Sequence, residues 1–387
     1  MSFDQYQQEI YLEGLSGKTP DFPLELAELE RRFEAEVEPT LRDYVSASAG
    51  NEDTDRENLE AFRRWRIVPK MLTNVQTRDL STSLFGSSIP APVLLAPIGG
   101  VQGGLHPDGE LAVARVASSL GIPLVLSTVS SRTLEEVGEA MGDTPHWFQL
   151  YWPSDDEFTT SLLDRAKAAG YGAIVLTLDT RLLAWRPRDL RNGFLPFIKG
   201  ESIANYLSDP VFRSRLDKTP EEDMQPAIFE WMRMFSYTST TWESLAFLRE
   251  ATDLPLLVKG VVSGDDAALA VEAGVDGIIV SNHGGRQVDG SIATLDALPS
   301  VKQAVPDGFP VLMDSGIRSG ADALKALALG ADAILLGRPY IWGLGVGGEE
   351  GVRQVLRGFL ADLELTFALA GFPSLEGVDA EVLTRRP

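Results

Sequence analysis

The sequence predicts an α/β protein with a (β/α)8 barrel, in which a ring of eight parallel strands alternates with helices. Eight short apolar runs occur along the chain, and amphipathic helical patterns lie between them. Continuous apolar runs of this kind are typical of strands that are buried on both faces. The 387 residues are sufficient for one such barrel, which commonly takes about 250 residues plus insertions. An open, doubly wound sheet also fits the alternation and is the competing architecture.

The elements follow one another in a regular order. Residues 1–70 carry polar, acidic helical patterns and predict a helical N-terminal extension. Several later helical patterns begin with Ser, Thr or Asp and end with Gly, which is typical of helix caps. We expect a single domain over residues 1–387. The expected strands are Val93–Pro97, Pro123–Ser127, Trp147–Tyr151, Ala173–Thr177, Leu256–Lys259, Gly277–Ser281, Pro310–Asp314 and Ala333–Gly337.

The spacing breaks after the fourth expected strand. Asp179 and Leu254 are 75 positions apart, and only residues 242–251 between them show a helical pattern. The remainder predicts a long irregular loop, and loops of this length are commonly functional. We interpret residues 187–240 as a lid. Its aromatic residues near position 230 indicate that it packs on another part of the protein.

Composition excludes several classes of function. The chain has 34 basic and 56 acidic residues, a net charge of −22, which disfavours nucleic acid and anionic membranes as partners. It has no cysteine, so disulfides, thiolate catalysis and cysteine-ligated metals are excluded. We expect no metal site. The N-terminus has no basic segment followed by an apolar run, which favours a cytoplasmic location.

Polar side chains gather at the carboxyl ends of the expected strands, where the active sites of such barrels lie. Because burying so many polar groups without partners is costly, the pattern predicts a polar ligand at the barrel mouth. These residues are Ser127, Gln149, Tyr151, Thr177, Asp179, Lys259, Ser281, His283, Arg286, Asp314, Arg318, Gly337 and Arg338.

Three of these positions, with one further arginine, predict chemistry. His283, in SNHGGRQ after the sixth strand, is a candidate general base. Arg286 in the same motif and Arg186 after the fourth strand are candidates for a carboxylate clamp. Lys259 ends an apolar strand, so its charge predicts an anionic partner. A Schiff-base lysine is the competing interpretation and would make the protein an aldolase or lyase.

Glycine-rich segments follow the last two expected strands. They are DSGIRSG, which contains Arg318, and LGRPY, which contains Arg338. Loops at this position form the phosphate site in many (β/α)8 barrels, where backbone N–H groups and an arginine bind the anion. The pair therefore predicts a ligand that carries a phosphate.

Taken together, SNHGGRQ, the preceding Lys259 and the stretch DSGIRSGADALKALALGADAILLGRP resemble the FMN-dependent 2-hydroxy acid oxidases and dehydrogenases. The similarity runs from about residue 20 to residue 375. It implies a (β/α)8 barrel with FMN at its mouth, a small 2-hydroxy acid and O2 as substrates, and a homotetramer or larger assembly.

The resemblance also implies roles for individual residues. His283 is the base, Tyr44, Arg186 and Arg286 bind the substrate carboxylate, and Tyr151 lies near the substrate hydroxyl. Lys259 lies at flavin N1 and O2, and Asp179 completes the catalytic set. The residues expected to hold the flavin ring and ribityl chain are Ile98, Gly99, Ser127, Gln149, Thr177 and Ser281. Those expected at the ribityl chain and phosphate are Asp314, Ser315, Gly316, Arg318, Gly337 and Arg338.

Within the family, this chain looks most similar to the lactate 2-monooxygenases. Gly99 stands where many members have alanine, and the N-terminal FDQYQQEIYLEGLSG, the segment RLLAWRPRDL and the long loop add to the likeness. This implies oxidation of L-lactate followed by oxidative decarboxylation of a caged 2-oxo acid. Release of H2O2, or electron transfer to another acceptor, stays open, as does the choice between hydride and carbanion mechanisms. Val129 stands where some oxidases have a bulkier residue, which leaves room for a substrate larger than lactate.

Overall fold

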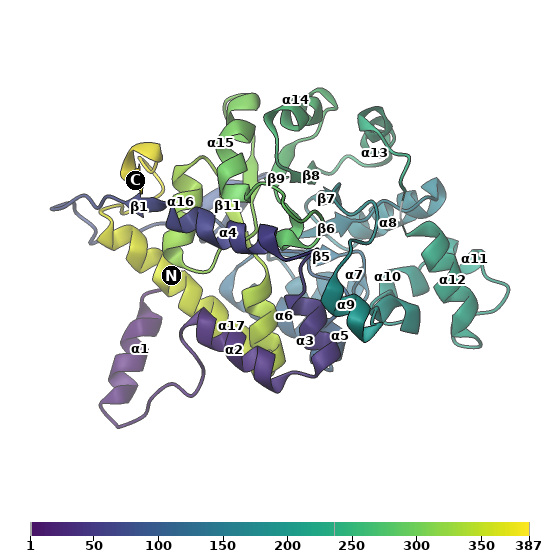
Figure 1. The fold of residues 1–387 in the computed structure, drawn as a ribbon, viewed down its shortest axis with the longest axis horizontal. Helices are drawn as coiled ribbons and strands as arrows, with labels where there is room; N and C mark the ends of the chain where they lie inside the picture. The colour runs from purple at the N-terminus through teal and green to yellow at the C-terminus, as the bar shows by residue number, and fades with distance from the viewer. Residues whose placement is uncertain (1, 236, 387) are drawn as a thin grey trace.

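The computed structural model describes residues 2–235 and 237–386, and its centre is a closed barrel of parallel strands (Figure 1). The strands pair in chain order around the ring, and the last closes it against the first. This confirms the predicted (β/α)8 fold and excludes an open sheet, which would leave two unpaired edges. The strands are β4 (Val93–Leu95), β5 (Leu124–Ser127), β6 (His146–Leu150), β7 (Ile174–Thr177), β8 (Leu256–Val261), β9 (Gly277–Val280), β10 (Val311–Met313) and β11 (Ala333–Leu336).

Helices surround the barrel, and several have the expected caps. In α7, Thr133 and Glu136 form a capping box, and Ser263 and Ser319 accept first-turn N–H bonds in α14 and α16. No described helix combines the length and the apolar character needed to cross a membrane. These helices are α5 (Gln102–Leu105), α6 (Glu110–Leu120), α7 (Leu134–Met141), α8 (Asp156–Ala168), α13 (Leu245–Ala251), α14 (Gly264–Glu272), η3 (His283–Gly285), α15 (Thr294–Ala304), α16 (Gly320–Ala328) and α17 (Arg338–Leu369).

Alternation along the strands divides the barrel interior into an apolar and a polar part. One buried cluster fills the inside of the ring and includes Leu94, Val125, Trp147, Val175, Leu257, Ile279, Leu312 and Leu335. Because side chains alternate between the two faces of a strand, the residues two positions later also face inward. Those positions hold Ala96, Ser127, Gln149, Thr177, Lys259, Ser281, Asp314 and Gly337. The barrel therefore ends in a mostly polar layer at the carboxyl ends of its strands.

A hairpin packs against the same inner cluster. It is formed by β2 (Thr82–Leu84) and β3 (Ser87–Ile89), which pair antiparallel. Leu84 and Ile89 belong to the apolar cluster inside the barrel, and the ring of Phe85 packs edge-on against Trp147 with centroids 5.6 Å apart. The hairpin thus extends the apolar filling of the barrel, away from the polar layer.

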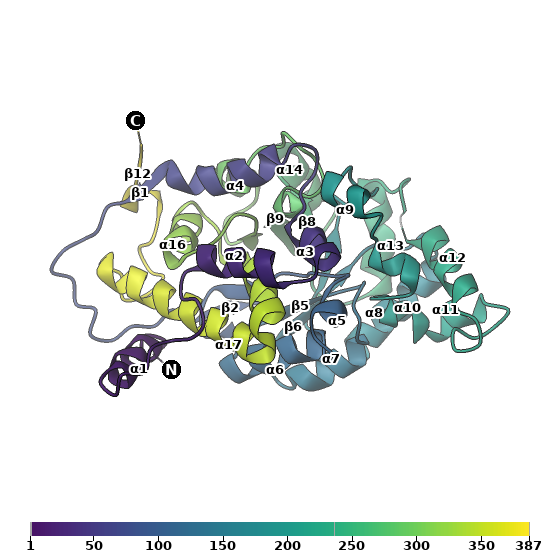
Figure 2. The ribbon, with the colours of Figure 1, turned by 60° about the horizontal axis from the view of Figure 1, so that its bottom comes forward.

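Four helices precede the barrel, namely α1 (Gln5–Gly14), α2 (Leu26–Glu36), α3 (Pro39–Ser46) and α4 (Asp53–Arg63). Helix α2 lies along α17, and α4 packs on α15 and η3 (Figures 1 and 2). Residues 65–67 are a strand instead of the expected helix, because β1 (Trp65–Ile67) pairs with β12 (Leu383–Arg385) at the other end of the chain. The short helix η4 (Ala380–Val382) precedes β12. Strands of three residues that pair across nearly the whole chain leave no periodic pattern in the local sequence.

The segment after β7 is not the irregular loop that we expected. It contains α9 (Pro187–Asn192), η1 (Pro196–Lys199), α10 (Ala204–Leu207), α11 (Pro210–Ser214), α12 (Met224–Met234) and η2 (Trp242–Ser244). Three of these helices begin with proline, which suits the first helical turn but interrupts any longer periodic pattern. Helices α10–α12 lie together on one side of the barrel (Figures 1 and 2). The aromatic side chain of Trp231 is buried there.

Candidate active site

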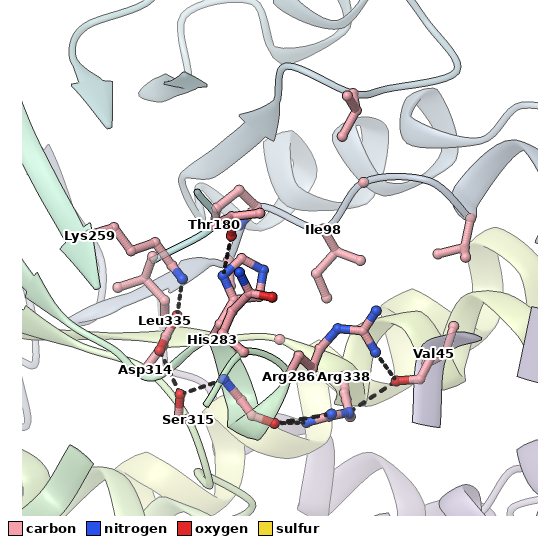
Figure 3. Close-up of a pocket in the computed structure, with 18 of the residues that line it drawn as sticks. Val45, Ile98, Thr180, Lys259, His283, Arg286, Asp314, Ser315, Leu335 and Arg338 are labelled. Carbon is pink, nitrogen blue, oxygen red and sulfur yellow. Dashed lines mark hydrogen bonds and ion pairs between the residues drawn. The ribbon is translucent and has the colours of Figure 1, made fainter. Parts of the chain in front are cut away.

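A cavity of about 1090 Å³, partly open to solvent, lies at the carboxyl ends of the barrel strands (Figure 3). Five predicted residues do not line it and lie behind its wall: Ser127, Gln149, Thr177, Asp179 and Ser281. The predicted residues that line it are Tyr44, Ile98, Gly99, Tyr151, Arg186, Lys259, His283, Arg286, Asp314, Ser315, Gly316, Arg318, Gly337 and Arg338.

Three of the residues behind the wall form a hydrogen-bonded chain across neighbouring strands. Ser127 Oγ donates to Gln149 Oε1 at 3.0 Å, and Gln149 Nε2 donates to Thr177 Oγ1 at 3.0 Å. The backbone at Gly99 lies directly against this chain. A Cβ atom at Gly99 would come within 2.7 Å of Ser127 Oγ and 2.4 Å of the Val129 carbonyl oxygen. The glycine that departs from the family pattern thus allows a close approach of two backbone segments.

Lys259 projects into the cavity from an irregularity in β8. The register between β8 and β9 shifts just after Lys259, where Gly260 has φ +114°. A Cβ atom on Gly260 would lie 2.9 Å from the Cβ of Asp179, so only glycine fits there. Lys259 Nζ donates to Ser281 Oγ at 2.9 Å and forms an ion pair with Asp314 at 3.1 Å.

The charge state of Lys259 distinguishes the two chemical interpretations. Burial favours the neutral amine, but the carboxylates of Asp314 and Asp179 outweigh burial and raise the pKa of Lys259. A Schiff-base lysine must be neutral to attack a carbonyl. The charged ammonium therefore fits a counter-charge for an anionic group and disfavours aldolase chemistry.

His283 lies on a tight turn after β9. The backbone of His283 has φ +59° and that of Gly284 has φ +64°, and the His283 N–H donates to Ser281 Oγ at 3.0 Å. His283 Nδ1 lies 2.8 Å from Asp179 Oδ1. It also lies 3.3 Å from Thr180 Oγ1 (Figure 3). Because a carboxylate holds Nδ1 in its protonated form, Nε2 is the nitrogen that can accept a proton from a ligand.

The protonation states suit a general base and its carboxylate. Burial lowers the pKa of His283, and the attraction of Asp179 does not offset it. Burial on its own would raise the pKa of Asp179, but His283 and Lys259 hold that pKa below its ordinary value. At neutral pH the imidazole is therefore neutral and the carboxylate is charged.

Two guanidinium groups lie against the ring of Tyr44. The guanidinium carbon of Arg186 is 5.4 Å and that of Arg286 is 5.1 Å from the ring centroid. Arg186 forms an ion pair with Asp189 at 2.7 Å. Arg286 Nη1 instead donates to three neutral carbonyls, those of Tyr44 at 2.7 Å, Ala47 at 2.6 Å and Val45 at 3.5 Å.

The charge of Arg286 is therefore available for a ligand. Burial, with the like charge of Arg186 added to it, lowers the pKa of Arg286 to about 10. A carboxylate that enters the cavity would relieve this repulsion and accept charge-assisted hydrogen bonds. Asp189 was not among the predicted residues. Its position three residues after Arg186, at the start of α9, is the signal that could have identified the pair.

A second pair of arginines lines the cavity. Arg318 lies over the ring of Trp342 at 5.0 Å, and its Nη1 donates to the Ile317 carbonyl at 3.0 Å. Arg338, at the start of α17, forms an ion pair with Asp55 at 3.2 Å. Burial, followed by the like charge of Arg338, lowers the pKa of Arg318. These cations at a helix N-terminus favour a bound anion.

These features fit FMN. Its flavin ring develops negative charge on reduction, for which the buried ammonium of Lys259 is a counter-charge. Its phosphate requires cations and backbone N–H groups, and Arg318, Arg338 and the glycine-rich loops supply them. In the part of the chain that the structure describes, Arg318 has no ion pair with a carboxylate, so its buried charge calls for an anionic ligand.

Fold and site together define a flavin-dependent oxidoreductase built on a (β/α)8 barrel. The family model described as FMN-dependent dehydrogenase matches residues 33–385, and the chain belongs to this family. Its cofactor is FMN, and its chemistry is the FMN-dependent oxidation of 2-hydroxy acids.

Named relatives and solved structures agree with this assignment. An L-lactate oxidase of Lysinibacillus sphaericus (strain C3-41) is 42% identical over 377 residues, which cover 97% of this chain and 96% of the relative. The 2-hydroxyacid oxidase 1 of Homo sapiens is 38% identical over 362 residues, 92% of this chain and 95% of the relative. A crystal structure of mandelate oxidase superposes with a TM-score of 0.82 at 38% identity, covering 94% of this chain and 98% of the other.

Sequence reasoning missed several residues that line the cavity. Thr180 and Gln287 each stand next to a predicted residue, and Gln287 Nε2 donates to the Asp179 carbonyl at 2.7 Å. Leu183 and Phe197 belong to the segment after β7. The path of that segment over the barrel depends on tertiary contacts that no local pattern reports.

Proposed function

We propose that this protein oxidises a short-chain L-2-hydroxy acid, with L-lactate as the expected substrate, and passes the electrons to O2. The observation that carries the proposal is the convergence of Arg186 and Arg286 on Tyr44 in the cavity that also contains His283. The names of the relatives, L-lactate oxidase and 2-hydroxyacid oxidase, support it. When bound, FMN would supply the two-electron redox chemistry between substrate and acceptor, and Lys259, Arg318 and Arg338 would hold it.

The residues of the chain would divide the work as follows. The two arginines and Tyr44 hold the carboxylate and so orient the α-carbon. His283 Nε2 accepts a proton, from the hydroxyl in a hydride mechanism or from the α-carbon in a carbanion mechanism. Burial raises the pKa of Tyr151, so its phenol stays protonated and hydrogen-bonds with the substrate hydroxyl. In all, the acid loses two electrons and two protons, and O2 takes them up as H2O2.

The apolar side chains that line the cavity favour a substrate with a short alkyl substituent. Val129, Leu183, Phe197 and Phe235 line the same cavity as the arginine clamp. The rings of Phe197 and Phe235 stack with centroids 6.2 Å apart. A methyl or short alkyl substituent gains from contact with such a wall, whereas a charged one would lose its hydration.

A second candidate outcome is that the 2-oxo acid stays in the cavity and reacts with H2O2, giving a carboxylate, CO2 and water. This would make the protein similar to a lactate 2-monooxygenase. The observation that favours it is that Phe197 and Phe235, both from the segment proposed as a lid over residues 187–240, line the cavity. A lid that slows product escape would give H2O2 time to react.

Oxygen uptake with excess L-lactate, with and without catalase, tests the proposal and separates its two outcomes. If H2O2 leaves the enzyme, catalase returns half of the oxygen and halves the net uptake. If H2O2 is consumed in the cavity, catalase has no effect and acetate accumulates. Oxygen uptake that no 2-hydroxy acid stimulates would contradict oxygen as the acceptor.

We also propose that the protein forms a homotetramer or a larger assembly. Light scattering of the holoenzyme measures the mass of this assembly.

A further inference from the structure

Thr180 contacts two residues of the proposed catalytic set, Asp179 and His283. It follows Asp179 directly after β7, and its Oγ1 donates to Asp179 Oδ1 at 3.0 Å. The same oxygen lies 3.3 Å from His283 Nδ1 (Figure 3). The Tyr151 side chain lines the same cavity as Thr180.

The carboxylate of Asp179 depends on few partners. Its Oδ1 accepts both side-chain hydrogen bonds, from His283 and from Thr180. Its Oδ2 is buried and has no hydrogen-bond partner among the described residues. Loss of the Thr180 hydroxyl would therefore leave His283 as the one described side chain that donates to this carboxylate. The carboxylate would then be free to rotate and would hold the imidazole less firmly.

Thr180 lies between two cavities. Thr180, Tyr151 and Phe235 line both the substrate cavity and a second cavity of about 1430 Å³, which is partly open to solvent. Asp179 lines the second cavity. Because Thr180 borders both cavities, hydrogen bonds contribute to the orientation of its hydroxyl.

We propose that Thr180 is a positioning residue for the oxidation of the 2-hydroxy acid. Its single hydroxyl proton goes to the charged Asp179, and this leaves a lone pair to accept from the His283 Nδ1–H. One side chain thereby helps to set both the carboxylate that holds the base and the ring orientation of the base. The inference rests on the proposed function of the same site.

The test compares holoenzymes that differ only at this hydroxyl. Thr180→Val keeps the side-chain shape and removes the hydroxyl, whereas Thr180→Ser keeps it. Thr240→Val is the matched control, because Thr240 lines the second cavity and its hydroxyl bonds only to the Tyr237 carbonyl among the described residues. We expect Thr180→Val to lower kcat about tenfold and to change KM by less than about twofold. Thr180→Ser should recover most of the loss, and Thr240→Val should behave as the wild type.

A second readout does not depend on turnover. The chain has 3 histidines, so selective ¹⁵N-histidine labelling gives a spectrum in which His283→Ala identifies the His283 signals. The Nδ1 resonance of His283 should shift in Thr180→Val and stay in place in Thr180→Ser. If no 2-hydroxy acid reduces the wild-type flavin, the proposed function fails, and this resonance still decides the role of Thr180. Wild-type kcat with an unshifted resonance in Thr180→Val, or equal impairment of the Ser and Val variants, would overturn the proposal.

Discussion

Replacement of Lys259 by methionine should cost more stability than any exposed charge on this protein. The Lys259 side chain is 4% exposed, that of Asp314 is 9% exposed, and the charged atoms are 3.1 Å apart. Methionine fills a similar volume but leaves the Asp314 carboxylate buried without its ion-pair partner. Breaking a buried pair in this way costs about 3–5 kcal/mol, because the remaining charge keeps its desolvation penalty.

The matched control is Lys167→Met. Lys167 and Asp253 are closer, at 2.7 Å, but their side chains are 54% and 72% exposed. Since water screens that pair, its loss should cost less than about 1 kcal/mol. The comparison shows whether the loss of stability depends on the burial of the ion pair or on the distance between its charged atoms.

Urea unfolding of the apoproteins measures how much free energy of unfolding Lys259→Met and Lys167→Met each lose, provided that the m-values of the variants agree. The double variant Lys259→Met, Asp314→Leu should regain part of the lost stability, since it removes the stranded charge. A loss below about 1 kcal/mol for Lys259→Met, or equal losses for both lysine variants, would refute the reasoning from burial.

Three further predictions concern the site. Because burial lowers the pKa of His283, kcat/KM should fall as the pH is lowered, with an apparent pKa below the ordinary value of 6.5. Asp179→Asn should move this fall to still lower pH and reduce kcat. A pH profile whose fall on the acid side lies above 6.5 is the contrary result. Arg286→Lys should raise KM for L-lactate about tenfold or more and change kcat less, as steady-state kinetics would measure; an unchanged KM speaks against the clamp. Asn58 and Asn282 exchange amide hydrogen bonds of 2.9 and 2.7 Å, so Asn58→Ala should lose FMN faster on dialysis, and equal retention would exclude a role in cofactor binding.

Much of the barrel interior could be predicted from position alone. Gln149 and Lys259 stand at the carboxyl ends of apolar strand patterns, and the period-two alternation places both side chains inside the ring. In a (β/α)8 barrel, strands that follow one another in the sequence lie side by side, so the polar layer at their carboxyl ends can be predicted from the local strand patterns. Short helices such as α9 and α11 could not be predicted, because a proline at the start and only one or two turns leave no periodic pattern.

The carboxylate clamp required long-range information. Tyr44 comes from α3 in the N-terminal helices and Arg186 from the segment after β7, and both reach Arg286 only through tertiary packing. The strand-end positions predicted the two arginines, whereas the family resemblance supplied Tyr44, since no spacing in the sequence connects it to them. Thr180 was missed because one hydroxyl beside a predicted aspartate has no pattern of its own.

Anaerobic titration of the holoenzyme with L-lactate, D-lactate and propionate, followed by flavin absorbance, tests whether the enzyme oxidises a 2-hydroxy acid that the arginine clamp holds, with His283 as the base. We expect L-lactate alone of the three to bleach the wild-type flavin, and His283→Ala to retain FMN in the oxidised form. A wild-type flavin that no 2-hydroxy acid bleaches, or a His283→Ala flavin reduced at the wild-type rate, would contradict it.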